Sequence, residues 1–327
     1  INLINSVMLT HWLEQLFKVH LDKNEGKTVS KQEYFETYKT AFTEQQLHFP
    51  DETNCLPDEE GYSKVYPWWP ADTLEEFNKQ MSKPGTKGLL EKFKWAQPDG
   101  SHTPIAYKIN KYGFRCKEFS DAPGVISLGC SMTFGIGLPE ENTWPGYIAK
   151  KTGLENWNLG CPGKGLDFIA PFLQFFIKDE LPNAKAILVF LPPSGRKTIW
   201  LDAEIEKGKH ELMGANLHGM DYEHEPYIHG PLPYVDFEKY RCNDVSAETL
   251  LLNSMWKREN AFQHEIGQLA IIEMVAKEMG IPLVVIGPHY CNAFEEHMDL
   301  ARDLLHPGRV NNKLIAEKFL LNLELDK

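Results

Sequence analysis

The stretch GVISLGCSMTFGIG, residues 124–137, joins a mostly apolar run to a turn built from small residues. The run between Gly124 and Gly129 is short and bounded by glycines, as is typical of a strand buried inside a sheet. Glycine at its end allows a tight exit and a close approach of other backbone. In an open parallel sheet, sites form at the carboxyl ends of the strands. The stretch therefore predicts a buried strand that ends beside Ser131, a candidate nucleophile.

The same strand pattern returns three times farther along the chain, with helical periodicity between the strands. Apolar strands that alternate with helices of this length indicate a parallel sheet covered on both faces. We therefore expect an α/β fold with three layers, α/β/α, around a mainly parallel, doubly wound sheet. The predicted strands are 124–128, 155–159, 185–191 and 282–287, and the predicted helices are 144–151, 168–177, 257–279 and 312–323.

Two regions depart from this alternation. Residues 1–104 have apolar residues at helical spacing around Trp12 and Tyr34, followed by a loop rich in proline and acidic residues. We expect a mainly helical N-terminal extension over 1–104 and the α/β domain over 105–327. Residues 195–250 show no clear period, and we expect an insertion over one edge of the sheet.

Composition excludes several classes of partner. The chain has 327 residues and a net charge of −12, so its field repels phosphate and anionic lipid. We expect no nucleic-acid partner and no membrane partner. The six cysteines contain no CxxC pair, and the first residues lack the pattern of a signal peptide. Reduced thiols and the lack of an apolar span predict a cytoplasmic protein.

A second chemical motif lies near the C-terminus. Asp303 and His306 are three residues apart in DLLHPG, after the last predicted strand and before the last helix. On such a turn the carboxylate could hold one ring nitrogen while the other faces Ser131. A surface capping role is the alternative for an isolated Asp-x-x-His pair.

Taken together, the motifs resemble the SGNH (GDSL-type) hydrolases from about Tyr107 to the end of the chain. NKYGFR (110–115) is similar to a segment that precedes the nucleophile strand in one branch of the family. SLGCSMTFGIG resembles the first family block, NWNLGCPGKG the second, and DLLHPG the last. The resemblance implies a flavodoxin-like fold with Ser131 as nucleophile, His306 as base and Asp303 as its orienter.

The resemblance also implies an oxyanion hole. Its donors would be the backbone N–H groups of Ser131 and Gly163, with Gly160 as the alternative if the register is shifted. The asparagine of the family's third block is missing, and LPPSGR offers Ser194 or Arg196 near that place. Cys130 stands where the family has aspartate, which removes no member of the triad. Asn110 and Arg115 are expected to be structural.

The expected activity is that of a serine esterase that removes a small acyl group, an O-acetyl group of a carbohydrate, through an acyl-enzyme. The partner would be a small-molecule or glycan ester. An O-acyltransferase with the same triad and a catalytically weak glycan-binding protein are the alternatives. Gly160, Arg196 and His289 are candidate substrate-binding residues, although His289 also fits a satisfied position on the rim. Aromatic residues in the insertion suit a flap over the nucleophile.

No cofactor or metal is expected. GCPGKG lacks the spacing of a phosphate-binding loop. The insertion contains four histidines, but their spacing matches no common zinc signature. Those histidines are His210, His218, His224 and His229.

Overall fold

The computed structural model describes residues 55–56, 59–192, 196–204, 210–218, 227–229, 258–287 and 299–323. These residues belong to one compact unit, Phe42–Lys327. The helices predicted around Trp12 and Tyr34 lie outside the described residues. In the described part, no helix combines the length and the apolar character that crossing a membrane requires.

The centre of the unit is a sheet in which all neighbouring strands are parallel. Its spatial order is β4-β3-β5-β9. This order, in which the chain starts in the interior of the sheet and then passes to each side, is that of flavodoxin-like folds. The strands are β3 (Gly124–Gly129), β4 (Glu155–Gly160), β5 (Ala184–Phe190) and β9 (Leu283–Ile286). The α/β fold and all four predicted strands are confirmed.

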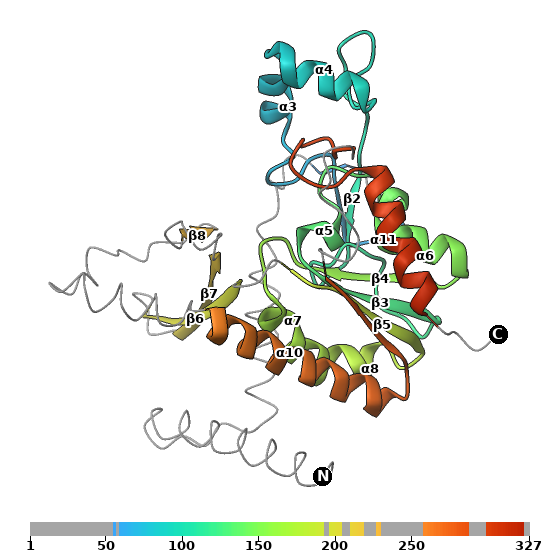
Figure 1. Ribbon diagram of the computed structural model, residues 1–327, viewed down its shortest axis with the longest axis vertical. Helices are drawn as coiled ribbons and strands as arrows, with labels where there is room; N and C mark the ends of the chain where they lie inside the picture. The colour runs from blue at the N-terminus through green and yellow to red at the C-terminus, as the bar shows by residue number, and fades with distance from the viewer. Residues whose placement is uncertain are drawn as a thin grey trace, which may run out of the picture. The chain divides into compact units, whose positions relative to one another are not determined.

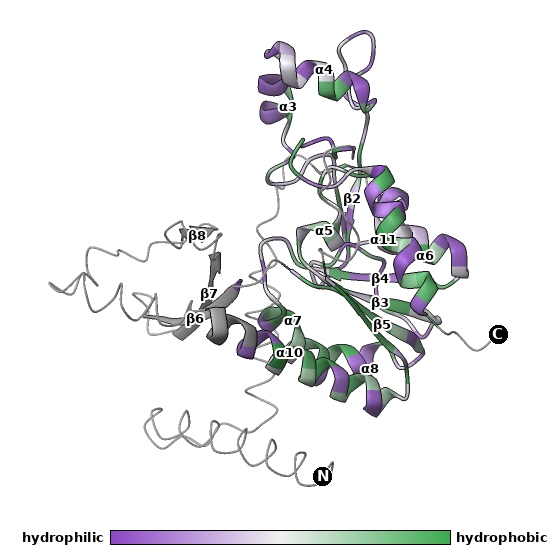
Figure 2. Ribbon diagram, in the orientation of Figure 1, coloured by the Kyte–Doolittle hydropathy of each residue, from purple (hydrophilic) through white to green (hydrophobic). Residues whose placement is uncertain are grey.

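Strand β3 is buried along its whole length, in keeping with the apolar pattern of its sequence. Figure 2 shows the hydrophobic character that β3 shares with β5. The register pairs Gly129 with Gly160 on one side of β3 and Leu128 with Val189 on the other. The carboxyl ends of these strands therefore meet at one edge of the sheet.

Helices form the two outer layers (Figure 1). Helices α6 (Trp144–Thr152) and α11 (Arg309–Asn322) contact each other on one side, where Trp144 stacks on Phe319 with ring centroids 4.5 Å apart. Helices α7 (Leu166–Phe172), α8 (Lys178–Glu180) and α10 (Arg258–Met279) form the other layer, with a π-helix at Leu173–Ile177. The helices predicted between the strands are confirmed.

Local sequence signals set the ends of α6. The hydroxyl of Thr143 accepts a hydrogen bond from the N–H of Gly146 at 3.1 Å, which caps the amino end. Pro145 stands in the first turn, where it removes no helical hydrogen bond. Gly153 ends the helix with a φ of 73°, a left-handed conformation that glycine adopts without strain.

The segment before the sheet contains a short antiparallel pair, β1 (Lys64–Tyr66) and β2 (Tyr107–Ile109), with helices α3 (Leu74–Met81) and α4 (Pro84–Lys92) between them. Strand β1 lies in the stretch rich in proline and acidic residues that was expected to be a loop, and it forms because its partner β2 lies far along the chain. The buried side chains of this segment form one cluster with Phe134, Leu138 and Ala301. The core is thus continuous across residue 104, and the division into two domains stays a prediction.

The insertion has more regular structure than its sequence indicates. Strands β6 (Lys197–Glu204), β7 (His210–His218) and β8 (Tyr227–His229) form an antiparallel sheet of their own. The backbone just before β6 lies against Gly165, since a Cβ added to Gly165 would be 2.4 Å from the carbonyl oxygen of Arg196. The insertion therefore begins beside the segment that follows β4.

Candidate active site

Ser131 is the first residue of α5 (Ser131–Phe134), the short helix that follows β3, and it is 7% exposed. The turn into α5 requires glycine at position 129, where φ is 152°. A Cβ at that position would lie 2.2 Å from Oγ1 of Thr133 and 2.6 Å from the carbonyl oxygen of Phe190. The ends of β3 and β5 therefore pack directly against the turn that carries Ser131.

The end of β4 holds the other side of α5. The buried Asn158 donates a hydrogen bond from Nδ2 to the carbonyl oxygen of Thr133 at 2.9 Å. A Cβ at Gly160 would lie 2.3 Å from the backbone nitrogen of Phe134, so only glycine fits there. These contacts fix the position of α5 at the edge of the sheet.

Arg115 and Asn110 are structural, as expected. The guanidinium of the fully buried Arg115 donates to the carbonyl oxygens of Phe134, Gly135 and Leu138 at 3.1, 2.6 and 2.7 Å. Burial lowers the pKa of Arg115 from its ordinary value. Oδ1 of Asn110 accepts from the N–H groups of two residues in the turn that follows it, Tyr112 and Phe114, at 3.0 Å each. The NKYGFR segment thus supports the loop after α5.

Asp303 and His306 contact each other as their spacing predicts. Nδ1 of His306 is hydrogen-bonded to Oδ2 of Asp303, whose side chain is 0% exposed. The other carboxylate oxygen accepts from the N–H groups of Leu305 and His306 at 3.1 Å each. Leu304, at the tip of this turn, has a φ of 55°. The carboxylate is therefore held from two sides, and among the described residues none is hydrogen-bonded to Nε2 of the imidazole.

This turn is joined to the loop that follows α5. The N–H of Arg302 donates to the carbonyl oxygen of Gly137 at 3.0 Å. Gly137 has a φ of 73°, and a Cβ there would lie 2.8 Å from the backbone nitrogen of Arg302. In the described part of the chain no hydrogen bond joins Ser131 to His306. Catalytic hydrogen bonds are often long before substrate binds, and the full triad stays a prediction.

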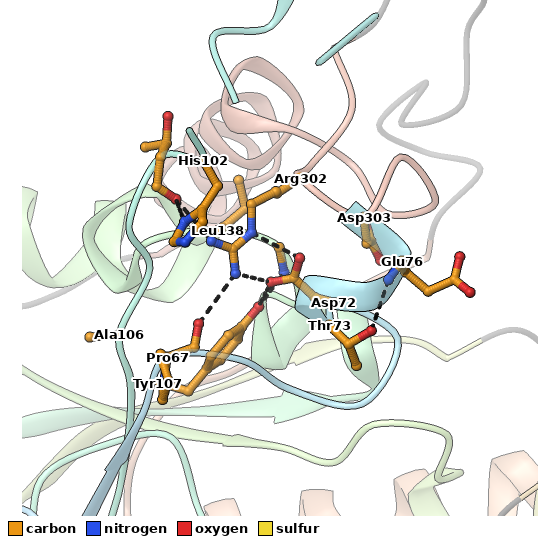
Figure 3. A network of polar contacts seen from close by, with 12 residues as sticks. Pro67, Asp72, Thr73, Glu76, His102, Ala106, Tyr107, Leu138, Arg302 and Asp303 are labelled. Carbon is orange, nitrogen blue, oxygen red and sulfur yellow. Dashed lines mark hydrogen bonds and ion pairs between the residues drawn. The ribbon is translucent and has the colours of Figure 1, made fainter. Parts of the chain in front are cut away.

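A buried ion pair supports the same turn (Figure 3). Nε and Nη2 of Arg302 donate to the two carboxylate oxygens of Asp72 at 2.9 and 2.7 Å. The hydroxyl of Tyr107 donates to Asp72 and accepts from the N–H of Gly137 at 2.8 Å. These residues were missed in the sequence, where an arginine beside the DLLH motif and an aspartate in an acidic loop carry no signal of pairing.

The oxyanion donors can be partly sorted by geometry. The N–H of Gly160 donates to Oδ1 of Asn158 at 3.0 Å, which favours Gly163 over Gly160 as the second donor, and the oxyanion hole stays a prediction. The N–H of Ser131 stands at the first position of α5, where a helix supplies no acceptor. Gly163 follows β4 with a φ of 77°. Ser194 and His289 lie outside the described residues.

Lys164, next to Gly163, is a buried cation that sequence reasoning missed. It is 7% exposed, and its Nζ lies 4.6 Å from the centroid of the Phe168 ring. Burial lowers the pKa of Lys164 from 10.5 to about 8. Arg196 is half-buried beside Gly165, and its Nη1 is buried with no hydrogen-bond partner in the described part. Two cationic residues thus lie at the segment after β4, Lys164 within it and Arg196 with its backbone against Gly165.

The depressed pKa of Lys164 leads to a testable pH dependence. Between about pH 8 and 10.5 the unfolded state binds more protons than the folded state, so the free energy of unfolding rises with pH in that window. Lys164→Met removes this cost of burying a charge. We expect the variant to be more stable than the wild type near pH 7, and the difference to shrink as the pH approaches 10.5.

Urea unfolding of both proteins across this pH range measures the effect. Lys151→Met is the matched control for the removal of a lysine, because Lys151 is exposed at the end of α6. Equal pH dependence for Lys164→Met and the wild type would show that Lys164 does not titrate in this window.

A cavity of about 760 Å³ lies apart from these residues, and neither Ser131 nor His306 lines it. Its walls come from 104–108, from 139–141 and from the amino end of β4. Burial raises the pKa of Glu140 on its wall. The four histidines of the insertion have no described side chains. Elsewhere in the described residues, no three His, Cys, Asp or Glu side chains are grouped as a metal site requires.

Comparisons with known proteins add two structural neighbours. No protein-family model and no curated protein matches the chain. It aligns with a lipolytic protein of the G-D-S-L family from Desulfitobacterium hafniense DCB-2, at 14% identity and a TM-score of 0.27, over 61% of this chain and 99% of that one. A second, from Veillonella parvula DSM 2008, aligns at 13% identity and a TM-score of 0.29, over 61% and 97%. These values are too low to assign an activity to this chain.

Proposed function

We propose that the chain is a serine esterase of the SGNH type with Ser131 as nucleophile. The observation that carries the proposal is the Asp303–His306 pair, which has a buried carboxylate and whose turn is hydrogen-bonded to the loop that follows Ser131. Nucleophilic acyl transfer needs a base that is oriented by a carboxylate and a serine within its reach. The Asp303–His306 pair supports the first, and the turn at the carboxyl edge of the sheet presents Ser131 as the candidate for the second. The order of the motifs along the chain supports the same proposal.

The reaction follows from these roles. Nε2 of His306 takes the proton of the Ser131 hydroxyl as Oγ bonds to the carbonyl carbon of the ester. The N–H groups of Ser131 and Gly163 stabilise the oxyanion, and such donors are worth about 3 kcal/mol each. The intermediate expels the alcohol, which takes the proton from His306. Water then attacks the acyl-enzyme with His306 as base, which releases the acid and restores Ser131.

The substrate we propose is an acetyl ester of a carbohydrate. The family resemblance suggests this class. The sequence of the insertion contains aromatic residues, and the insertion begins with its backbone against Gly165. Aromatic faces next to polar groups suit sugar rings.

Hydrolysis of p-nitrophenyl acetate, with and without added sugars, tests the activity. An esterase releases p-nitrophenol and acetate in equal amounts, whereas an acyltransferase releases p-nitrophenol and acetylated sugar. Ser131→Ala provides the background rate. If the wild type releases p-nitrophenol no faster than this variant but still binds glycans, the protein is a binding module and the esterase proposal is wrong.

The insertion provides a prediction about specificity. Among the described strands, β6, β7 and β8 pair only with one another, so we expect a short Gly-Ser linker in place of 197–250 to leave the central sheet intact. We expect kcat/KM for an acetylated sugar to fall about tenfold or more relative to that for p-nitrophenyl acetate. We expect the Tm to change by less than about 4 °C. An unchanged ratio of the two kcat/KM values would show that the insertion does not select the substrate.

A further inference from the structure

Four hydrogen-bonding groups form a closed ring between the two loops of the proposed site. The N–H of Gly137 donates to the hydroxyl of Tyr107, and that hydroxyl donates to Asp72. Asp72 accepts from the guanidinium of Arg302 at 2.7 and 2.9 Å. The backbone N–H of Arg302 then returns to the carbonyl oxygen of Gly137 at 3.0 Å. The ring therefore joins the loop after Ser131 to the residue before Asp303.

The ring is closed to water. The exposed fractions are 0% for Tyr107 and Arg302 and 3% for Asp72. Burial beside Asp72 raises the pKa of Tyr107 well above its ordinary value, so the hydroxyl keeps its proton and remains a donor to Asp72. In such surroundings an unpaired polar group is costly, so each member depends on the others.

Residues before the sheet add further contacts to the same turn. Nε2 of Gln80 in α3 donates to the carbonyl oxygen of Asp303 at 2.9 Å. Nη1 of Arg302 donates to the carbonyl oxygen of Thr103 at 2.8 Å, and its guanidinium lies 4.0 Å from the Trp68 ring centroid. The backbone on both sides of the Asp303 carboxylate is thus fixed from the segment 68–107.

We propose that Tyr107 and Asp72 are positioning residues that hold the Asp303–His306 pair in register with Ser131. The inference rests on the proposed function for its catalytic consequence. The segment before the sheet then contributes to the reaction by positioning the Asp303–His306 pair, although it supplies no member of the triad. Misplacement of a catalytic group by about 1 Å can lower the rate about 100-fold, so a loosened ring lowers kcat while substrate binding is kept.

Tyr107→Phe tests the inference, because it keeps the ring stacked near Phe134 and removes only the hydroxyl. We expect kcat to fall about 10- to 100-fold with KM within about twofold of the wild type. The matched control is Phe319→Leu, which loses buried volume in α11 in a separate cluster. We expect the control to lower the Tm to a similar extent and to keep the wild-type kcat.

A spectroscopic readout separates this inference from the proposed function. The Nδ1–H of His306, bonded to a carboxylate, gives a downfield proton resonance that is assigned by its absence in His306→Gln. We expect Tyr107→Phe to broaden or shift this resonance and Phe319→Leu to leave it unchanged. If Tyr107→Phe does not fold, Gln80→Ala takes its place, because it removes a contact made directly to Asp303.

The outcomes are distinct. A wild type that hydrolyses no ester contradicts the proposed function, and the resonance alone then decides whether the ring positions the pair. If the wild type is active and Tyr107→Phe matches Phe319→Leu in both kcat and resonance, the ring is only structural and the inference is wrong.

Discussion

We expect replacement of Ser131 with alanine to lower the rate of ester hydrolysis by a factor of ~10⁴ or more and to leave the fold intact. The reason for the loss is that no acyl-enzyme can form without Oγ. The fold is kept because Ser131 is small and its side chain makes no hydrogen bond within the described residues. Steady-state hydrolysis of p-nitrophenyl acetate measures the first effect, and circular dichroism with thermal unfolding measures the second.

Cys130→Ala is the control for the adjacent thiol. Cys130 is fully buried in the apolar cluster between the sheet and α11, so it stabilises the core and does not face substrate. We expect this variant to keep kcat/KM within a few-fold of the wild type. If activity survives in Ser131→Ala and disappears in Cys130→Ala, the nucleophile is Cys130 and the assignment of Ser131 is wrong.

We expect Arg302→Met to cause a large loss of stability. The substitution leaves the Asp72 carboxylate buried without its counter-ion, and breaking a buried pair in this way costs about 3–5 kcal/mol. We expect the free energy of unfolding, measured by urea denaturation, to fall by about that amount. Adding Asp72→Asn to Arg302→Met removes the uncompensated charge and should restore part of the loss.

The matched control is an exposed ion pair. Nζ of Lys79 lies 2.8 Å from Oε1 of Glu76 on the surface of α3, where solvent screens the interaction. Lys79→Met is therefore expected to change the free energy of unfolding little. If Arg302→Met unfolds at the same urea concentration as Lys79→Met, the buried pair does not stabilise the fold.

The parts of the fold that follow from local sequence were predictable. Strands β3, β5 and β9 are short, largely apolar runs bounded by glycine or proline, and this pattern is typical of the strands of a parallel sheet. The helices between them carry their own signals, as Thr143 and Gly153 do at the ends of α6. Periodicity and capping are local properties, so they can be read from one sequence.

The parts that depend on distant partners were not predictable. Strand β1 is three residues long and exists because it pairs with β2, and β6 is ordered by pairing with β7. The site shows the same division. Asp303 and His306 are three residues apart, so their contact could be expected, whereas Asp72 and Arg302 come together only in the folded chain. Gly160 was predicted as a possible donor because the sequence does not reveal that Asn158 already occupies its amide.

Covalent labelling tests the central claim most directly. A fluorophosphonate reacts with a serine that a neighbouring base activates, and peptide mass spectrometry identifies the residue that carries the phosphonyl group. We predict a single modified serine, Ser131, in the wild type, and loss of the modification in His306→Gln. No modification of Ser131, or modification that persists at an equal rate in His306→Gln, would contradict it.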